Sequence, residues 1–250
     1  MTDLTCDAFL GGRVQLWQPR RGYRAGIDPV LLAAAVPARP GETALDLGCG
    51  VGAAALCLAA RVDGVKVTGV EVQPAYADLA RRNAAENGLA LEVIAADLRE
   101  LPADLRQRQF HHVLMNPPYF DRSRGTGSDD MGRDIAFGGD TALGDWLDVG
   151  IRRLAPKGHL TLIQHISRLP EVLAGIGDRL GSVAVCPLVP RTGRPPDRFL
   201  LRGILAGRAA FRMTAGLLIH DGAAHDGDRE SYAEDIGRVL RDGYKLDIFA

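Results

Sequence analysis

Residues 44–52 read ALDLGCGVG, an apolar strand that runs directly into a glycine-rich turn. Residues 53–60, which follow this turn, are good helix formers. Glycines let a backbone approach a ligand closely, and the N-terminus of a helix presents free N–H groups to it. The spacing Gly-x-Gly-x-Gly differs from the Gly-x-Gly-x-x-Gly expected for dinucleotides. Asp46 before the turn would repel a pyrophosphate, so the pattern predicts a ligand with an ammonium group.

A second strand, residues 65–70, ends at Glu71. An acidic residue at a strand end about 20 residues beyond such a turn can accept hydrogen bonds from both hydroxyls of a ribose. Further strands and helices alternate along the chain in the manner of an α/β, doubly wound, mostly parallel sheet. The expected helices are residues 53–60, 75–87, 143–154 and 170–180, and the expected later strands are residues 91–95, 112–115, 160–163, 183–189 and 199–205.

The strand at residues 112–115 leads into Asn116-Pro117-Pro118-Tyr119. The two prolines remove backbone donors and fix φ, so this turn is stiff. The Asn116 amide oxygen and the Pro117 carbonyl can both accept hydrogen bonds from one planar NH₂ group, and the Tyr119 ring can stack on the ring that carries it. The turn therefore suits chemistry on an amide or an exocyclic amine, although an Asn-Pro turn is also an ordinary way to end a strand.

Taken together, these motifs resemble the class I S-adenosylmethionine-dependent methyltransferases of the Asn-Pro-Pro-Tyr, amino-methylating branch. The chain is most similar to the bacterial tRNA(Val) adenine-N6 methyltransferase family. The resemblance covers nearly the whole length. It implies a seven-stranded Rossmann-like sheet with an antiparallel C-terminal hairpin and S-adenosyl-L-methionine as the cofactor. It also implies two parts: an N-terminal extension, residues 1–40, with a cofactor-covering motif at residues 24–32, and a methyltransferase domain, residues 41–250.

The resemblance also implies which residues act. Asn116, Pro117 and Tyr119 would be catalytic, with the first two accepting from the amine that is methylated. Asp97 would accept from the adenine amino group of the cofactor. The full set of expected cofactor contacts is Arg24, Gly26, Asp28, Asp46, Gly48, Cys49, Gly50, Gly52, Glu71, Val72, Asp97, Leu98 and Asn116. The expected substrate contacts are Tyr119, Phe120, Arg191 and Arg194.

Charge and composition constrain the partners. A net charge of −1 and a pI near 6.6 argue against a generic, phosphate-driven binder of nucleic acids. Local clusters can still steer an RNA, and we expect a tRNA substrate held between two arginine groups, Arg13, Arg20, Arg21 and Arg24 on one side and Arg191, Arg194, Arg198 and Arg202 on the other. The four cysteines form no Cys-x-x-Cys pair, so no metal site is expected.

The chain has no apolar run of about 20 residues, and its acidic start is unlike a signal peptide. We therefore expect no membrane contact and a cytoplasmic location, and no obligate protein partner is evident. We expect residues 121–139, which lack an apolar period, to form a mobile binding loop beside the catalytic turn.

Alternatives to a tRNA substrate remain open. Asn-Pro-Pro-Tyr serves any planar NH₂ group, so a glutamine side chain of a protein, or amino groups of rRNA or DNA, could be the substrate. Glutamine methyltransferases commonly carry an added helical N-terminal domain, whereas only about 40 residues precede the glycine-rich turn here. A non-catalytic scaffold is a further alternative, against which intact Asp46, Glu71 and Asn116 argue.

Overall fold

The computed structural model of the chain describes residues 3–119, 141–222 and 231–249. Phe120 and the loop expected at residues 121–139 lie outside the described residues. None of the helices within the described ranges is long and apolar enough to cross a membrane.

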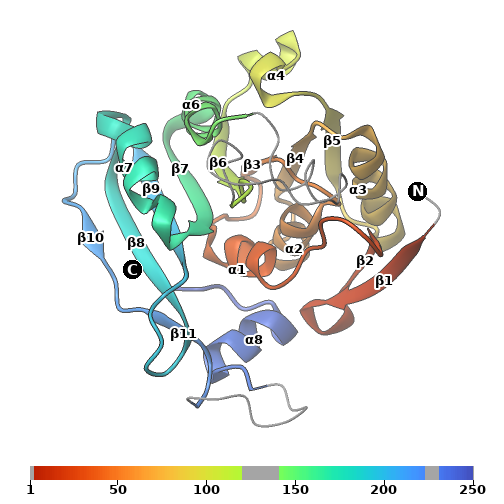
Figure 1. The fold of residues 1–250 in the computed structure, drawn as a ribbon. Helices are drawn as coiled ribbons and strands as arrows, with labels where there is room; N and C mark the ends of the chain where they lie inside the picture. Colours follow the sequence, from red (N-terminus) through yellow and green to blue (C-terminus); the bar gives the residue numbers. More distant parts are fainter. Residues whose placement is uncertain (1–2, 120–140, 223–230, 250) are drawn as a thin grey trace, which may run out of the picture.

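A mixed nine-stranded sheet forms the centre of the molecule (Figure 1). Its strands follow the order β10-β8-β9-β7-β6-β3-β4-β5, and β11 pairs with β8 beside β10. Strands β3 to β7 run parallel, whereas β9 is antiparallel to both of its neighbours, β7 and β8. The bounds are β3 (Thr43–Leu47), β4 (Lys66–Glu71), β5 (Leu91–Ala95), β6 (Phe110–Met115), β7 (Leu154–His165), β8 (Leu180–Arg191), β9 (Arg198–Leu205), β10 (Arg212–Met213) and β11 (Leu217–His220).

The expected doubly wound class and the antiparallel hairpin, β8–β9, are thus confirmed. Among the described residues the sheet has nine strands, two more than the seven expected. The two additional strands, β10 and β11, are two and four residues long. Such short segments cannot show the alternation from which a strand is predicted.

Helices cover both faces of this sheet and form two apolar cores. On one side, α1 (Asp28–Ala35), α2 (Ala53–Arg61), α3 (Pro74–Asn87) and α8 (Glu234–Asp242) pack. On the other side lie α4 (Ala103–Gln107), α6 (Leu143–Arg152) and α7 (Leu169–Ile176). Short 3₁₀ turns occur at Leu10–Gly12, Leu98–Glu100, Ile166–Arg168 and Gly177–Arg179.

Strand β6 shows how the two cores are separated. Leu114 joins the core under α1 and α2, whereas Val113 and Met115 join the core under α6 and α7. Successive side chains of a strand point to opposite faces, so a continuous apolar run supplies both cores. The strand thereby holds its carboxyl end, where the Asn116 turn begins, rigidly between two helical layers.

Residues 4–19 form an unexpected antiparallel hairpin of β1 (Leu4–Phe9) and β2 (Val14–Pro19), separate from the main sheet. Asn83 of α3, which is fully buried, docks this hairpin: its Oδ1 accepts from the Trp17 N–H at 2.8 Å, and its Nδ2 donates to the Trp17 carbonyl at 3.1 Å. The same Nδ2 donates to the Val51 carbonyl of the glycine-rich turn at 2.9 Å. One side chain therefore ties the hairpin, α3 and the turn together.

Candidate active site

A cavity of about 390 Å³ opens at the carboxyl ends of β3, β4 and β6. Fourteen of the residues expected at the site line it: Arg24, Gly26, Asp28, Asp46, Gly48, Cys49, Gly50, Glu71, Val72, Asp97, Leu98, Asn116, Pro117 and Tyr119. Gly52 does not line the cavity but precedes α2 with a φ of 88°. Arg191 and Arg194 lie away from the lining, and Phe120 is outside the described residues.

The glycine-rich turn is shaped by its lack of side chains. A Cβ at Gly48 would overlap the Trp146 ring of α6, and a Cβ at Gly69 in the neighbouring strand would lie 2.7 Å from the Cys49 sulfur. Gly50 has a φ of +55°, and a Cβ there would project into open space. The backbone at Gly50 is therefore exposed to whatever occupies the cavity, while Gly48 is needed for packing.

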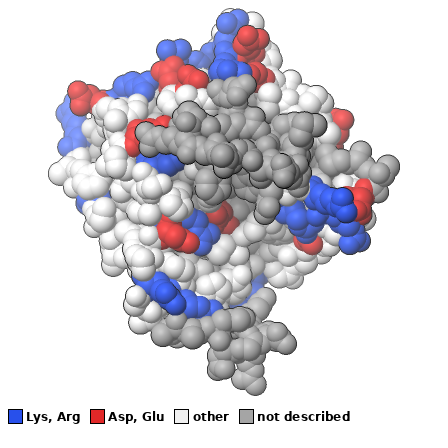
Figure 2. Space-filling view, viewed as in Figure 1, with Lys and Arg blue, Asp and Glu red and all other residues white. Residues whose placement is uncertain are grey.

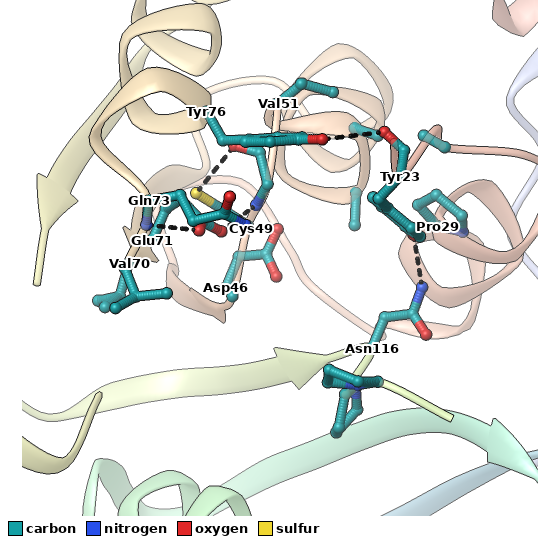
Figure 3. A pocket seen from close by; sticks show the side chains of 18 of the residues that line it. Tyr23, Pro29, Asp46, Cys49, Val51, Val70, Glu71, Gln73, Tyr76 and Asn116 are labelled. Atoms are coloured by element: carbon teal, nitrogen blue, oxygen red, sulfur yellow. Dashed lines mark hydrogen bonds between the residues drawn. The ribbon is translucent and has the colours of Figure 1, made fainter. Parts of the chain in front are cut away.

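Asp46 lies between Glu71 and Asn116 in the view of Figure 3. It is 2% exposed, and its Oδ2 has no hydrogen-bond partner among the described residues. Burial, and to a smaller extent the charge of Glu71, raises the pKa of Asp46 to about 8. An unpartnered buried carboxyl oxygen is costly unless a donor or a cation meets it, so Asp46 is prepared for a positively charged ligand.

Two further carboxylates are held at the ends of β4 and β5. Glu71 accepts from the Gly50 N–H at 2.9 Å and from the Gln73 N–H at 2.8 Å, which fixes both of its oxygens at the mouth of the turn. Asp97 accepts from the side chain of Arg99 at 2.7 Å, and this bond, more than any other contact, lowers the pKa of Asp97. Asp97 therefore stays ionised beside the cavity.

Asn116 contacts a tyrosine from the N-terminal segment. Its Nδ2 donates to the Tyr23 hydroxyl at 3.3 Å, and the Tyr23 carbonyl accepts from the Tyr76 hydroxyl at 3.4 Å (Figure 3). Burial and the nearby Asp28 and Asp46 carboxylates raise the pKa of Tyr23, so this hydroxyl stays protonated. With Nδ2 turned toward Tyr23, the Asn116 oxygen is turned away from it, available as an acceptor.

Tyr119 is tied to the start of α1. Its hydroxyl donates to Asp28 Oδ2 at 2.5 Å, and the Arg198 guanidinium forms an ion pair with the other oxygen of Asp28. Burial and the adjacent Asp28 carboxylate raise the pKa of Tyr119. The carboxylate of Asp28, expected from sequence to contact the cofactor, is thus engaged by the Asn116–Tyr119 turn and by β9.

The arginines expected at the site are mostly engaged in structural contacts. Arg24 lines the cavity, but its guanidinium donates to the Thr5 hydroxyl at 2.6 Å and to Asp7 of the hairpin at 2.6 Å. Arg191 donates to the Asp221 carbonyl at 2.8 Å, which joins β8 to the end of β11. Arg194 is exposed.

Among the residues that line the cavity, Tyr23, Tyr76 and Trp146 were not expected from the sequence as part of the site, and Arg198 was expected only in the arginine group that would hold an RNA. They come from α3, α6, β9 and the N-terminal segment. No local motif marks them, because only the sheet order and the packing of the helices bring them to one place.

Comparison with known proteins agrees with this geometry. A family model described as the methyltransferase small domain matches residues 25–135. A relative from Shewanella halifaxensis, named tRNA1(Val) (adenine(37)-N6)-methyltransferase, is 32% identical over 188 residues, covering 73% of this chain and 74% of that protein. A protein of the same name from Porphyromonas gingivalis is 30% identical over 226 residues, covering 86% and 88%. This chain belongs to that methyltransferase family.

Solved structures agree on the methyltransferase fold. A predicted O-methyltransferase from Agrobacterium tumefaciens superposes with a TM-score of 0.70 at 27% identity, covering 88% of this chain and 98% of that one. A SAM-dependent O-methyltransferase from Thermotoga maritima shares the fold with a TM-score of 0.54 at 17% identity, covering 76% and 69%. As a member of this methyltransferase family, the chain is an enzyme, and its cofactor is S-adenosyl-L-methionine.

The methyltransferase cavity fits this cofactor chemically. Four acidic side chains line it, from Asp28, Asp46, Glu71 and Asp97, whereas its two guanidinium groups are themselves paired with acids. A cofactor with a sulfonium and an ammonium group complements that excess of negative charge. The unpartnered oxygen of Asp46 offers an acceptor for the ammonium group. Val72, apolar yet 58% exposed, offers a surface for an adenine ring.

Proposed function

We propose that this chain transfers a methyl group from S-adenosyl-L-methionine to the exocyclic N6 of an adenine in the anticodon loop of a valine-type tRNA. The observation that carries the proposal is the position of Asn116 and Pro117, which line the same cavity as Asp46 and Glu71. Acceptors for an amine and acceptors for the cofactor thus face one space. The names of the relatives specify the adenine and the tRNA for those proteins, and we extend both to this chain.

The chain's own residues would act by orientation. The lone pair of an aromatic amine is delocalised into its ring, so the amine is a poor nucleophile until acceptors draw its hydrogens out of the ring plane. Asn116 and the Pro117 carbonyl supply two such acceptors, preorganised on a stiff turn. Tyr119 would stack on the base once it has left its own stack. When bound, S-adenosyl-L-methionine would supply an electrophilic methyl group, and the methylated nitrogen would release one of its two protons to solvent.

In the cofactor site, Glu71 would accept from the ribose hydroxyls, Asp97 from the adenine amino group, and Asp46 from the ammonium group. Residues 23–29 of the N-terminal extension line the cavity, which supports the proposal that residues 1–40 cover the cofactor.

The proposal includes no metal and no obligate protein partner. We propose the cytoplasm as the compartment because tRNA is found there.

A folded RNA would approach over a surface with separated basic areas. On the face seen in Figure 2, Lys and Arg side chains gather at the right margin, where the N-terminal hairpin lies, and in the lower part, where β8 and β11 lie. Loop bases are the usual targets of specific RNA recognition because they unstack at low cost.

The direct test is methylation by the purified protein. An unmodified tRNA(Val) transcript should acquire N6-methyladenosine, detected in its nucleoside digest, and a matched transcript with the loop adenine replaced by guanine should not. If the protein instead methylated a glutamine in a protein and left the transcript unchanged, the tRNA proposal would be wrong and a protein would be the substrate.

A further inference from the structure

The Asn116–Tyr119 turn is anchored from an unexpected side. Pro117 and Pro118 carry no backbone N–H, so neither can be held by donating a hydrogen bond. Their carbonyls are held instead by Gln164, near the end of the adjacent strand β7. Gln164 Nε2 donates to the Pro117 carbonyl at 3.1 Å and to the Pro118 carbonyl at 3.4 Å.

The orientation of the Gln164 amide follows from its other contact. Its Oε1 accepts from the His165 N–H at 2.7 Å, so the nitrogen must face the two carbonyls. Gln164 is fully buried in the sheet. Burying an amide is costly unless both of its ends are bonded, and here both are. The position therefore demands a donor toward the turn, not merely a side chain of this size.

We propose that Gln164 is a positioning residue for methyl transfer, which aims the Pro117 carbonyl at the amine. A carbonyl oxygen has two lone pairs. Gln164 engages one of them, and Pro117 is one of the residues that line the cavity. The inference rests on the proposed function, because it assigns the second lone pair to the substrate amine.

The position of the Pro117 carbonyl depends on Gln164 more than the position of the Pro118 carbonyl does. The Pro118 carbonyl has a second donor, the guanidinium of Arg168 at 3.3 Å, which is itself held by Glu171 at 2.8 Å. Losing the Gln164 amide would therefore leave Pro118 anchored and release Pro117. Misplacing a reacting contact by about 1 Å can cost on the order of 100-fold in rate.

Two substitutions test the role in the full-length protein. Gln164→Leu keeps the size but removes the donor, and kcat should fall by about 10–100-fold while the Kd for S-adenosylhomocysteine stays within about twofold. Gln164→Glu should be pH-dependent, because its carboxyl donates only when protonated, and burial raises its pKa. The kcat of Gln164→Glu relative to wild type should rise by roughly tenfold from about pH 9 to about pH 6, whereas the ratio for Gln164→Leu should be flat.

Thr161→Val is the matched control. Thr161 lies on the same strand, is 1% exposed, and its hydroxyl has no partner among the described residues. This variant should keep wild-type kcat. Wild-type kcat in Gln164→Leu, or a pH-independent ratio in Gln164→Glu, would overturn the positioning role.

A structural readout separates this inference from the proposed function. In a crystal structure of Gln164→Leu, the Pro117 carbonyl oxygen should lie about 1 Å or more from its position in wild type and in Thr161→Val, whereas the Pro118 carbonyl should stay in place. A wild-type protein inactive on tRNA would refute the proposed function, yet the position of the Pro117 carbonyl would still decide whether Gln164 holds the turn. An unchanged position of that carbonyl would refute the positioning role.

Discussion

At the scale of single residues, the carboxyl group of Asp46 has a different pKa in the folded protein than in water. Its pKa of about 8 lies above the ordinary value of 3.8 because the carboxyl is buried. The fold therefore favours the protonated form, and this contribution to the free energy of unfolding is present at low pH and lost as the pH rises from about 4 toward 8. A cationic ligand reverses the preference by meeting the ionised carboxylate.

Asp46→Asn tests both the effect of this carboxyl group on stability and its role in cofactor binding. Without cofactor, the variant should equal wild type in free energy of unfolding near about pH 4 and exceed it near about pH 9, because Asn carries no charge to bury. Its binding of S-adenosylmethionine should be weaker by about 1–3 kcal/mol. Urea unfolding and calorimetry measure the two quantities. Wild-type affinity in the variant would remove Asp46 from the cofactor site.

Asn116→Ala should separate chemistry from binding. The Asn116 amide would act mainly as the amine becomes nucleophilic, so transfer should be lost while cofactor affinity is retained. Single-turnover assays with a parallel cofactor titration measure both. If more than about a tenth of the wild-type rate remained, which is under about 1.4 kcal/mol of barrier, Asn116 would not have this role.

At the scale of secondary-structure elements, the segment between the N-terminal hairpin and α1, with the first turn of α1, completes the site. Residues 23–29, between β2 and the first turn of α1, line the cavity. Tyr119 and Arg198 both bond to Asp28 at the start of α1, so this helix is coupled to the Asn116–Tyr119 turn and to β9. The position of the extension should therefore influence cofactor binding.

Asn83→Ala tests that coupling. The buried Asn83 amide docks the hairpin on α3 and holds the Val51 carbonyl, so its loss should lower the free energy of unfolding by about 1–3 kcal/mol and weaken cofactor binding. Denaturant titration with and without S-adenosylhomocysteine measures both effects. Asp78→Asn, an exposed change on the same helix that does not touch the hairpin, should stay within about 0.5 kcal/mol of wild type. Equal stability of the two variants would contradict the docking role.

The elements that the sequence predicts are those with a long, local signal. Strand β5 was predicted with its observed bounds, Leu91–Ala95, and the helix before it ends at Asn87 as expected. Helix α7 ends at Ile176, earlier than the expected residue 180, because Gly177 takes a φ of 49° and β8 begins at Leu180. The hairpin at residues 4–19 had a detectable signal: Gly11 and Gly12 separate two strand-like runs, and the second alternates buried Val14 and Leu16 with exposed Gln15.

The site was predictable only where motifs mark it. Asp46, Glu71 and Asn116 each follow from a strand end with a characteristic neighbour, and the structure brings them to one cavity. Arg198 and Gln164 reach the site from β9 and β7 without any local pattern, because the strand order places β7 beside β6 and β9 beside β7. Such residues need the tertiary structure to be found.

At the scale of the whole molecule, the net charge of −1 means that an RNA must be held by local positive charge rather than by the overall field. Arg191 is a poor probe of this, since its side chain joins β8 to the end of β11 through the Asp221 carbonyl. Exposed Arg21 and Arg194 are better probes, and they lie in the two basic segments on which the tRNA proposal depends.

Arg21→Glu and Arg194→Glu should each weaken tRNA binding and reduce the slope of log K against log salt by roughly 1, while cofactor affinity stays unchanged. Lys66→Glu, at the amino end of β4 and thus at the edge of the sheet opposite the cavity, should leave both unchanged. Filter binding over a salt series measures the slopes. Equal slopes for all three variants and wild type would mean that the RNA binds elsewhere.

The central claim, methylation of an adenine N6 in tRNA, is tested most directly in cells. Nucleosides from total tRNA should be compared by mass spectrometry between cells with the gene, cells without it, and cells that carry only Asn116→Ala. The account predicts that N6-methyladenosine in valine tRNA is present with the wild-type gene and lost in the other two. Unchanged N6-methyladenosine in tRNA without the gene, with loss of a methylated glutamine in a protein, would contradict it.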